Sequence, residues 1–132
     1  MGPDMKLLLL AASGGALGAG ARFLVNQAFA SIGLTGFPWA TLSVNVLGGF
    51  LMGAVMTLVT ERFGGSPEMR VFLATGILGG LTTFSAFTFE VAQLIGTNGA
   101  VSPRVLLYIA GSVVLSLAAL YAGMALTRAV LI

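Results

Sequence analysis

Residues 79–87 read GGLTTFSAF and lie inside a long apolar run, residues 71–95, that could cross a membrane. Adjacent glycines weaken a helix, so Gly79 and Gly80 predict an interruption at that point. An interruption frees backbone groups at membrane depth, where only protein or an ion can satisfy them. Three hydroxyl side chains follow: Thr82, Thr83 and Ser85. Freed carbonyl oxygens suit a hard cation, and the positive start of a resumed helix suits an anion.

The composition of the whole chain is that of an integral membrane protein. Of its 132 residues, 58% are hydrophobic and 8% are charged, whereas a soluble domain has about 25% charged residues. The chain has no cysteine and no histidine, which excludes disulfides, thiol nucleophiles and the usual zinc or haem ligands. A net charge of +2 is too small to indicate a nucleic-acid partner.

Four stretches are long and apolar enough to span a bilayer, which takes about 20 residues. The ranges are 7–29, 38–60, 71–95 and 105–127. The first could pass for a signal peptide, but three further spans favour a transmembrane helix. We therefore predict an all-α membrane protein, one four-helix domain over residues 1–132, with its third helix interrupted.

The positive residues are distributed unevenly between the two ends of such a bundle. With the N-terminus inside, the inner side would hold Lys6, Arg62, Arg70 and Arg128, and the outer side Arg104. The positive-inside rule then favours an inner N-terminus, by a small number of charges.

Small residues at helical spacing predict close helix packing. Three G-x-x-x-G pairs occur: Gly14 with Gly18, Gly49 with Gly53, and Gly76 with Gly80. Such pairs let two backbones approach closely. They could pack helices within one subunit, but three pairs exceed what four helices need, so we expect some of them to contact a second subunit.

A few polar residues lie inside the predicted spans, where each needs a partner. Asn45 is either a hydrogen-bonding link between helices or a donor that lines an ion path, and its position alone does not decide between them. Tyr108, Ser112 and Ser116 recur every four residues and so share one helix face. This stripe predicts a polar track.

Two charges and two aromatic rings complete the candidate site. Arg22 could reach the membrane surface or place a positive charge at the mouth of a pathway. Glu90 is the only carboxylate well inside a span, and it is a functional candidate by position. Phe84 and Phe87 share a helix face, and the positive edges of their rings could attract a small anion weakly.

The sequence resembles the small bacterial fluoride channels called Fluc or CrcB. Three segments in order carry the resemblance: GGALGAGAR (14–22), PWATLSVNVLGGF (38–50) and TGILGGLTTFSAF (75–87). It covers nearly the whole chain. It implies a passive fluoride channel in the inner membrane of the cell that relieves fluoride toxicity, built as an antiparallel, dual-topology homodimer with two pores.

The resemblance also implies roles for individual residues. Phe84 and Phe87 match the pore-lining rings, with Thr83 and Ser85 beside them, and Asn45 matches the central pore asparagine. The stripe of Tyr108, Ser112 and Ser116 falls on the family's polar track, and Arg22 matches an arginine near the vestibule. Gly79 and Thr82 match positions whose carbonyls, from both subunits, hold a structural Na⁺ ion at the dimer centre. The family usually has TTFSTF where this chain has Ala86 in place of the second threonine.

Two other functions compete with a channel. A small proton-coupled multidrug exporter would need a carboxylate in the first helix, which has none there, so Glu90 would have to serve. A non-transporting assembly subunit would explain the glycine pairs but not the polar residues. An enzyme is not expected, because no buried base, nucleophile or metal cluster is evident.

Overall fold

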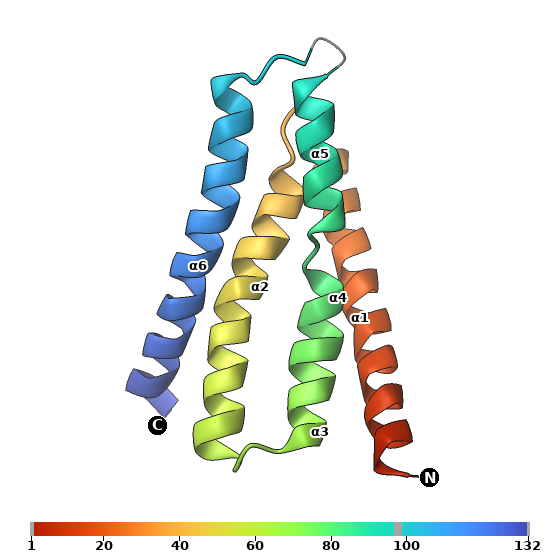
Figure 1. The fold of residues 1–132 in the computed structure, drawn as a ribbon, viewed down its shortest axis with the longest axis vertical. Helices are drawn as coiled ribbons and strands as arrows, with labels where there is room; N and C mark the ends of the chain where they lie inside the picture. Colours follow the sequence, from red (N-terminus) through yellow and green to blue (C-terminus); the bar gives the residue numbers. More distant parts are fainter. Residues whose placement is uncertain (1, 97–98, 132) are drawn as a thin grey trace.

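The computed structural model describes residues 2–96 and 99–131 as an up-and-down bundle of helices. Four rods run side by side, and both ends of the chain lie at the same end of the bundle (Figure 1). Within those residues, four helices are long and apolar enough to cross a membrane: Pro3–Ser31, Trp39–Arg62, Pro67–Ile95 and Pro103–Leu131. The prediction of an all-α protein with four spanning helices is confirmed.

Two of the rods are built from several consecutive segments. The second rod is α2 (Trp39–Thr57) continued by the π-helix η1 (Leu58–Arg62). The third consists of α3 (Pro67–Met69), the π-helix η2 (Arg70–Leu78), α4 (Gly79–Leu81) and, after an interruption, α5 (Ser85–Ile95). The first and fourth rods are single helices, α1 (Pro3–Ser31) and α6 (Pro103–Leu131), and each begins with a proline at its first position, where the missing N–H costs nothing.

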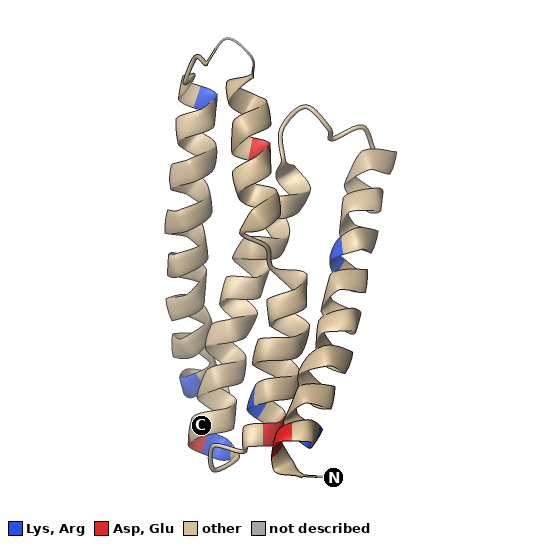
Figure 2. Cartoon of the chain, turned by 45° about the vertical axis from the view of Figure 1, so that its right-hand side comes forward, with Lys and Arg blue, Asp and Glu red and all other residues tan. Residues whose placement is uncertain are grey.

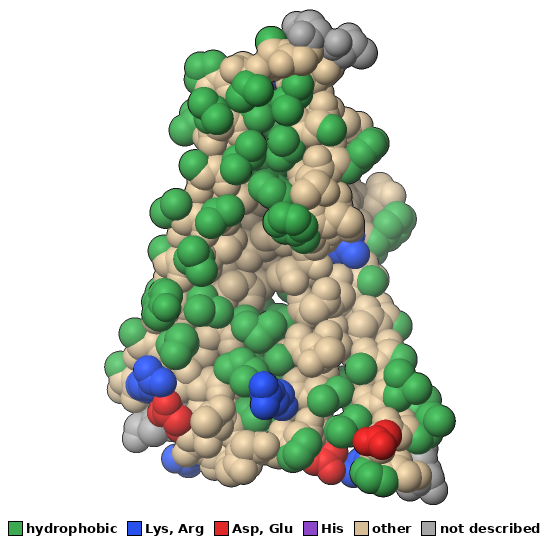
Figure 3. Space-filling model, in the orientation of Figure 1, with side chains coloured by type: hydrophobic (Ala, Val, Ile, Leu, Met, Phe, Trp, Pro, Cys, Tyr) green, Lys and Arg blue, Asp and Glu red, His purple; other side chains and the backbone are tan. Residues whose placement is uncertain are grey.

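Hydrophobic side chains lie along most of the face seen in Figure 3, and most of the charged residues gather at the end that holds both termini (Figure 2). Two ion pairs stabilise that end. Lys6 Nζ lies 3.1 Å from Glu68 Oε1, and Arg128 Nη2 lies 2.7 Å from Glu61 Oε1. All four side chains are partly exposed, so each pair adds little to stability.

The glycine pairs pack helices of the same chain against each other. A Cβ atom on Gly18 would overlap the Ile77 carbonyl oxygen, and one on Gly80 would overlap the Gly15 carbonyl oxygen. Gly49 and Gly53 approach the backbone of α6 in the same way. Within the subunit, α1 packs on η2 and α4, and α2 packs on α6, through these small residues, and the expectation that some of the pairs contact a second subunit stays a prediction.

The position of the helix interruption also differs from the prediction. The glycines Gly79 and Gly80 remain helical in α4, and the chain leaves the helix at Thr82, whose φ and ψ are −82° and 155°. The helix resumes at Ser85. Glycine weakens a helix, but both residues stay helical here, and Gly80 packs closely against the backbone of α1. Side chains around residues 82–84 define the interruption instead.

Candidate functional site

The interruption between α4 and α5 is fixed by hydrogen bonds that replace regular helical ones. At its start, the Leu78 carbonyl oxygen accepts from both the amide and the hydroxyl of Thr82, at 3.0 and 2.8 Å. This pair of hydrogen bonds to one carbonyl oxygen ends α4 and leaves the Thr82 amide with a partner. The next residues are then free to bond elsewhere.

Asn45 of α2 binds the main chain of Thr83 with both ends of its amide. Its Nδ2 donates to the Thr83 carbonyl oxygen at 3.0 Å, and its Oδ1 accepts from the Thr83 amide at 2.9 Å. The link between helices that the sequence left open is thus present. Because the Nδ2 group has two hydrogens and this bond uses one, a second donor remains for another partner.

The restart of the helix depends on the Thr83 side chain. Its Oγ1 accepts from the Ala86 amide at 3.1 Å, as an N-terminal capping residue does. The same hydroxyl lies 3.3 Å from Ser85 Oγ. Thr83 and Ser85 therefore have local roles in this subunit that their sequence positions did not reveal.

Arg22 lies beside the interruption, and its positive charge is half-buried in the bundle. Its Nε donates to the Gly80 carbonyl oxygen at 3.2 Å. In an uninterrupted helix that carbonyl would accept from the Phe84 amide. The expected vestibule arginine is thus also a partner for one of the carbonyls that the interruption frees.

A groove of about 500 Å³ lies next to the interruption, between α2, α4, α5 and α6. Its lining includes most of the residues singled out from the sequence: Asn45, Gly79, Thr82, Thr83, Phe84, Phe87, Ser112 and Ser116. Among the residues that the structure describes, the buried hydroxyls of Ser112 and Ser116 have no hydrogen-bond partner. Since buried hydroxyls are normally paired, these two donors are suited to a ligand in the groove.

The two phenylalanines stand at the groove in different environments. Their ring centroids are 5.5 Å apart with an interplanar angle of 40°. Phe87 is buried, whereas Phe84 is 75% exposed. The rings are therefore adjacent, as their spacing predicts, and one of them projects from the subunit.

Tyr108 does not join Ser112 and Ser116 in lining the groove. It is completely buried, and its hydroxyl donates to Glu90 Oε2 at 2.7 Å. Thr41 donates to the other oxygen, Oε1, also at 2.7 Å. The three residues form a cluster that the sequence analysis did not assemble, although a lone carboxylate inside a span was the signal for it.

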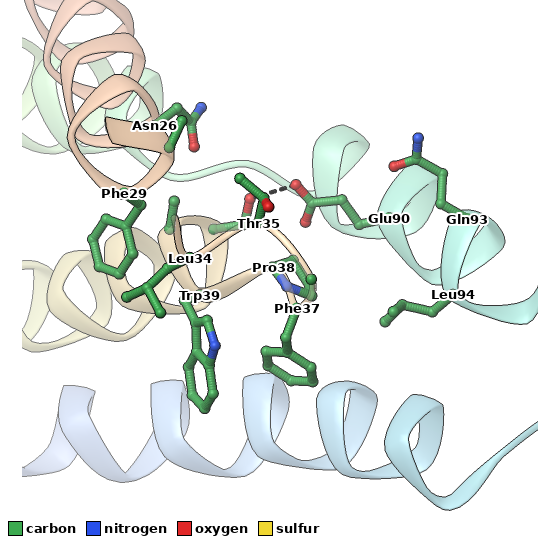
Figure 4. Close-up of a pocket in the computed structure, with 14 residues that line it drawn as sticks. Asn26, Phe29, Leu34, Thr35, Phe37, Pro38, Trp39, Glu90, Gln93 and Leu94 are labelled. Atoms are coloured by element: carbon green, nitrogen blue, oxygen red, sulfur yellow. Dashed lines mark hydrogen bonds between the residues drawn. The ribbon is translucent and has the colours of Figure 1, made fainter. Parts of the chain in front are cut away.

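This cluster borders a second cavity, of about 440 Å³, near the connection between α1 and α2. Glu90 and Thr41 line it together with the amides of Asn26 and Gln93 and with several aromatic rings. Figure 4 shows Glu90 and Gln93 on one side and Asn26 on the other, with Phe37 and Trp39 below them. The cavity combines polar groups and apolar rings at the end of the bundle opposite the termini.

The residues expected to hold a cation are backbone carbonyls, and the interruption has removed their regular donors. In a continuous helix, Gly79 O would accept from the Thr83 amide and Thr82 O from the Ala86 amide. Those amides are bound instead to Asn45 Oδ1 and Thr83 Oγ1. Both residues line the groove, so this part of the chain fits a hard cation by carbonyl oxygens. No group of three or more His, Cys, Asp or Glu side chains occurs within residues 2–96 and 99–131.

Comparison with known proteins gives a consistent set of relatives. The model of the family described as "CrcB-like protein, Camphor Resistance (CrcB)" matches residues 9–124. A protein of Rhizobium meliloti (strain 1021) named "Fluoride-specific ion channel FluC" is 47% identical over 125 residues, which cover 95% of this chain and 98% of that protein. Proteins of the same name from Rhodospirillum centenum (strain ATCC 51521 / SW) and Hahella chejuensis (strain KCTC 2396) are each 44% identical, and each alignment covers 94% of this chain and 97% or 96% of the relative.

Proposed function

The chain belongs to the CrcB-like family, and from this membership and the geometry of the groove we propose that it is a fluoride-selective, passive ion channel. It is a multi-pass membrane protein. Fluoride that accumulates in the cytoplasm leaves through it down the concentration gradient, which lowers the toxicity of the ion. We place it in the inner membrane of the cell. Like the relatives named as ion channels, it is not an enzyme.

The observation that carries this proposal is the pair of unpartnered hydroxyls, Ser112 and Ser116, in the groove. An anion in the groove would meet these donors, the remaining N–H of Asn45 and the edges of the phenyl rings. No Lys or Arg lines the groove among the described residues. Neutral donors bind a fluoride ion weakly enough to release it, as conduction requires.

The groove also argues against a proton-coupled exporter. Such a transporter needs a carboxylate that alternates between proton and substrate. Glu90 does not line the groove, and both of its oxygens accept hydrogen bonds from buried partners, Thr41 and Tyr108. It is therefore poorly placed to exchange protons with a substrate there.

We further propose that two copies complete the pathway as an antiparallel, dual-topology homodimer. The groove is open, and Phe84 projects from it with 75% of its surface exposed. A second copy would cover both. It would also add its own Gly79 and Thr82 carbonyls, so that four oxygens instead of two would face a hard cation, which binds oxygen ligands. The bound ion would be Na⁺ at the dimer centre, with a structural role.

Fluoride efflux from proteoliposomes, followed with a fluoride electrode, tests the function. We expect rapid efflux without a proton gradient and little efflux of chloride. Proton flux driven by a cationic drug would favour the exporter, and the absence of any flux would favour an assembly subunit. A Ser13→Ala variant is a suitable control, because Ser13 is exposed and bonded to its own helix, so its efflux should equal that of the unaltered protein.

Topology is tested separately. Single cysteines can be introduced without background because the chain has none. In a dual-topology dimer, a cysteine at an exposed end, such as Glu61→Cys, is labelled by an impermeant reagent from both sides of the membrane. Labelling from one side alone would contradict the antiparallel arrangement, and it would leave the proposed transport of fluoride standing.

A further inference from the structure

Four carbonyl oxygens around the interruption divide into two classes. Those of Gly80 and Thr83 accept hydrogen bonds from side chains of other helices, Arg22 of α1 and Asn45 of α2. Those of Gly79 and Thr82 have lost their regular helical donors, because Asn45 Oδ1 and Thr83 Oγ1 hold the two amides concerned. The two residues with free carbonyls, Gly79 and Thr82, both line the groove, as does Thr83, whereas Gly80 does not.

We propose that Arg22, Asn45 and Thr83 are positioning residues that select which carbonyl oxygens of the interruption stay free to bind a sodium-sized cation. The inference rests on the cation site of the proposed function and assigns it a cause within one subunit. The three side chains keep the interruption from closing into a continuous helix, in which the carbonyls of Gly79 and Thr82 would regain amide partners.

Thr83 allows the smallest test. Thr83→Val has the same shape but no hydroxyl, so the Ala86 amide loses its acceptor and can return to the Thr82 carbonyl. Thr83→Ser keeps the hydroxyl and is the matched control. The full chain, purified in detergent, is melted in increasing NaCl, with N-methylglucamine chloride keeping the ionic strength constant.

We expect the Na⁺ concentration that gives half of the stabilisation to rise about three- to tenfold in Thr83→Val, as the loss of one hydrogen bond implies. In Thr83→Ser it should stay within about twofold of the unaltered protein, because the hydrogen bond remains. Equal midpoints in the two variants would overturn the proposal. So would a melting temperature of the unaltered protein that does not respond to Na⁺. Fluoride efflux measured on the same preparation shows separately whether the proposed channel function holds.

Arg22 gives a second test, in which the two possible roles predict opposite signs. A positive charge near a cation site repels Na⁺, so a purely electrostatic role predicts tighter Na⁺ binding in Arg22→Gln. A positioning role predicts weaker binding, by about tenfold for a bond from a charged donor. The reason is that the Gly80 carbonyl, without Arg22, is drawn towards the Phe84 amide.

Arg62→Gln is the control for this comparison, because it makes the same change of charge. Arg62 is exposed in η1, at the end of the bundle that holds both termini. Its Na⁺ midpoint should match that of the unaltered protein. An Arg22→Gln midpoint equal to or below that of Arg62→Gln would refute the positioning role of Arg22.

Discussion

Replacing Ser112 with alanine should raise the stability of the protein and lower its rate of fluoride efflux at the same time. The Ser112 hydroxyl is buried without a partner among the described residues, and an unpaired buried polar group costs about 1–3 kcal/mol. Removing it should raise the free energy of unfolding by about 1 kcal/mol. A serine with a normal buried hydrogen bond would give the opposite sign.

The effect on transport follows from the charge of the ligand. A hydrogen bond to a charged group is worth about 1.5–3 kcal/mol, and each 1.4 kcal/mol is a factor of about ten. If Ser112 donates to fluoride, the efflux rate from proteoliposomes should therefore fall at least about tenfold. The proposed dimer should remain intact on size-exclusion chromatography, because the substitution removes only one oxygen.

Thr57→Val is the matched control for this prediction. Thr57 is also buried with an unpartnered hydroxyl, but it does not line the groove. This variant should gain similar stability, measured by melting in detergent, and should keep its fluoride efflux. The reasoning fails if Ser112→Ala lowers the melting temperature and transports fluoride at the original rate, or if Thr57→Val slows efflux as much as Ser112→Ala does.

Three further predictions follow from the same structure. Phe84→Ile should slow fluoride efflux and leave the subunit folded, because the ring is 75% exposed; unchanged efflux would contradict its place in the pore. Gly18→Ala should lower the melting temperature, by an overpacking cost of about 1–3 kcal/mol, because its Cβ would overlap the Ile77 carbonyl oxygen. Gly20→Ala should not lower it, because Gly20 has open space around it. Equal melting temperatures of the two variants would contradict this packing. Tyr108→Phe should destabilise the protein by about 1–3 kcal/mol because it leaves one oxygen of the Glu90 carboxylate without its donor, and a melting temperature equal to that of the unaltered protein would show that this bond contributes nothing.

The sequence was sufficient to predict the four spanning helices. A bilayer accepts only long apolar segments whose backbone is satisfied internally, and four such segments are visible in the composition alone. The interruption was harder to place. Gly79 and Gly80 predicted it by their weak helix propensity, but both remain helical, and the backbone of α1 packs against Gly80. The side chain of Asn45, far away in sequence, supplies the bonds that hold the chain open at Thr83.

The candidate site was predicted in part for a similar reason. Helical spacing correctly put Ser112 and Ser116 on one face, and both line the groove. It also put Tyr108 on that face, but spacing does not reveal what the neighbouring helix presents. The longer tyrosine side chain reaches Glu90 on α5 and is buried there. Cross-helix partners of this kind become visible only when the helices are placed together.

The close approach of α1 to the third rod has a consequence for how these two parts of the subunit can move. Because the contact is made by main-chain atoms at Gly14, Gly18, Gly76 and Gly80, no long side chain can switch rotamer to let one rod slide by a turn past the other, the kind of shift that gates many proteins. The two are therefore expected to move as one rigid body, so the position of α1 and that of the interruption beside Gly80 are set together.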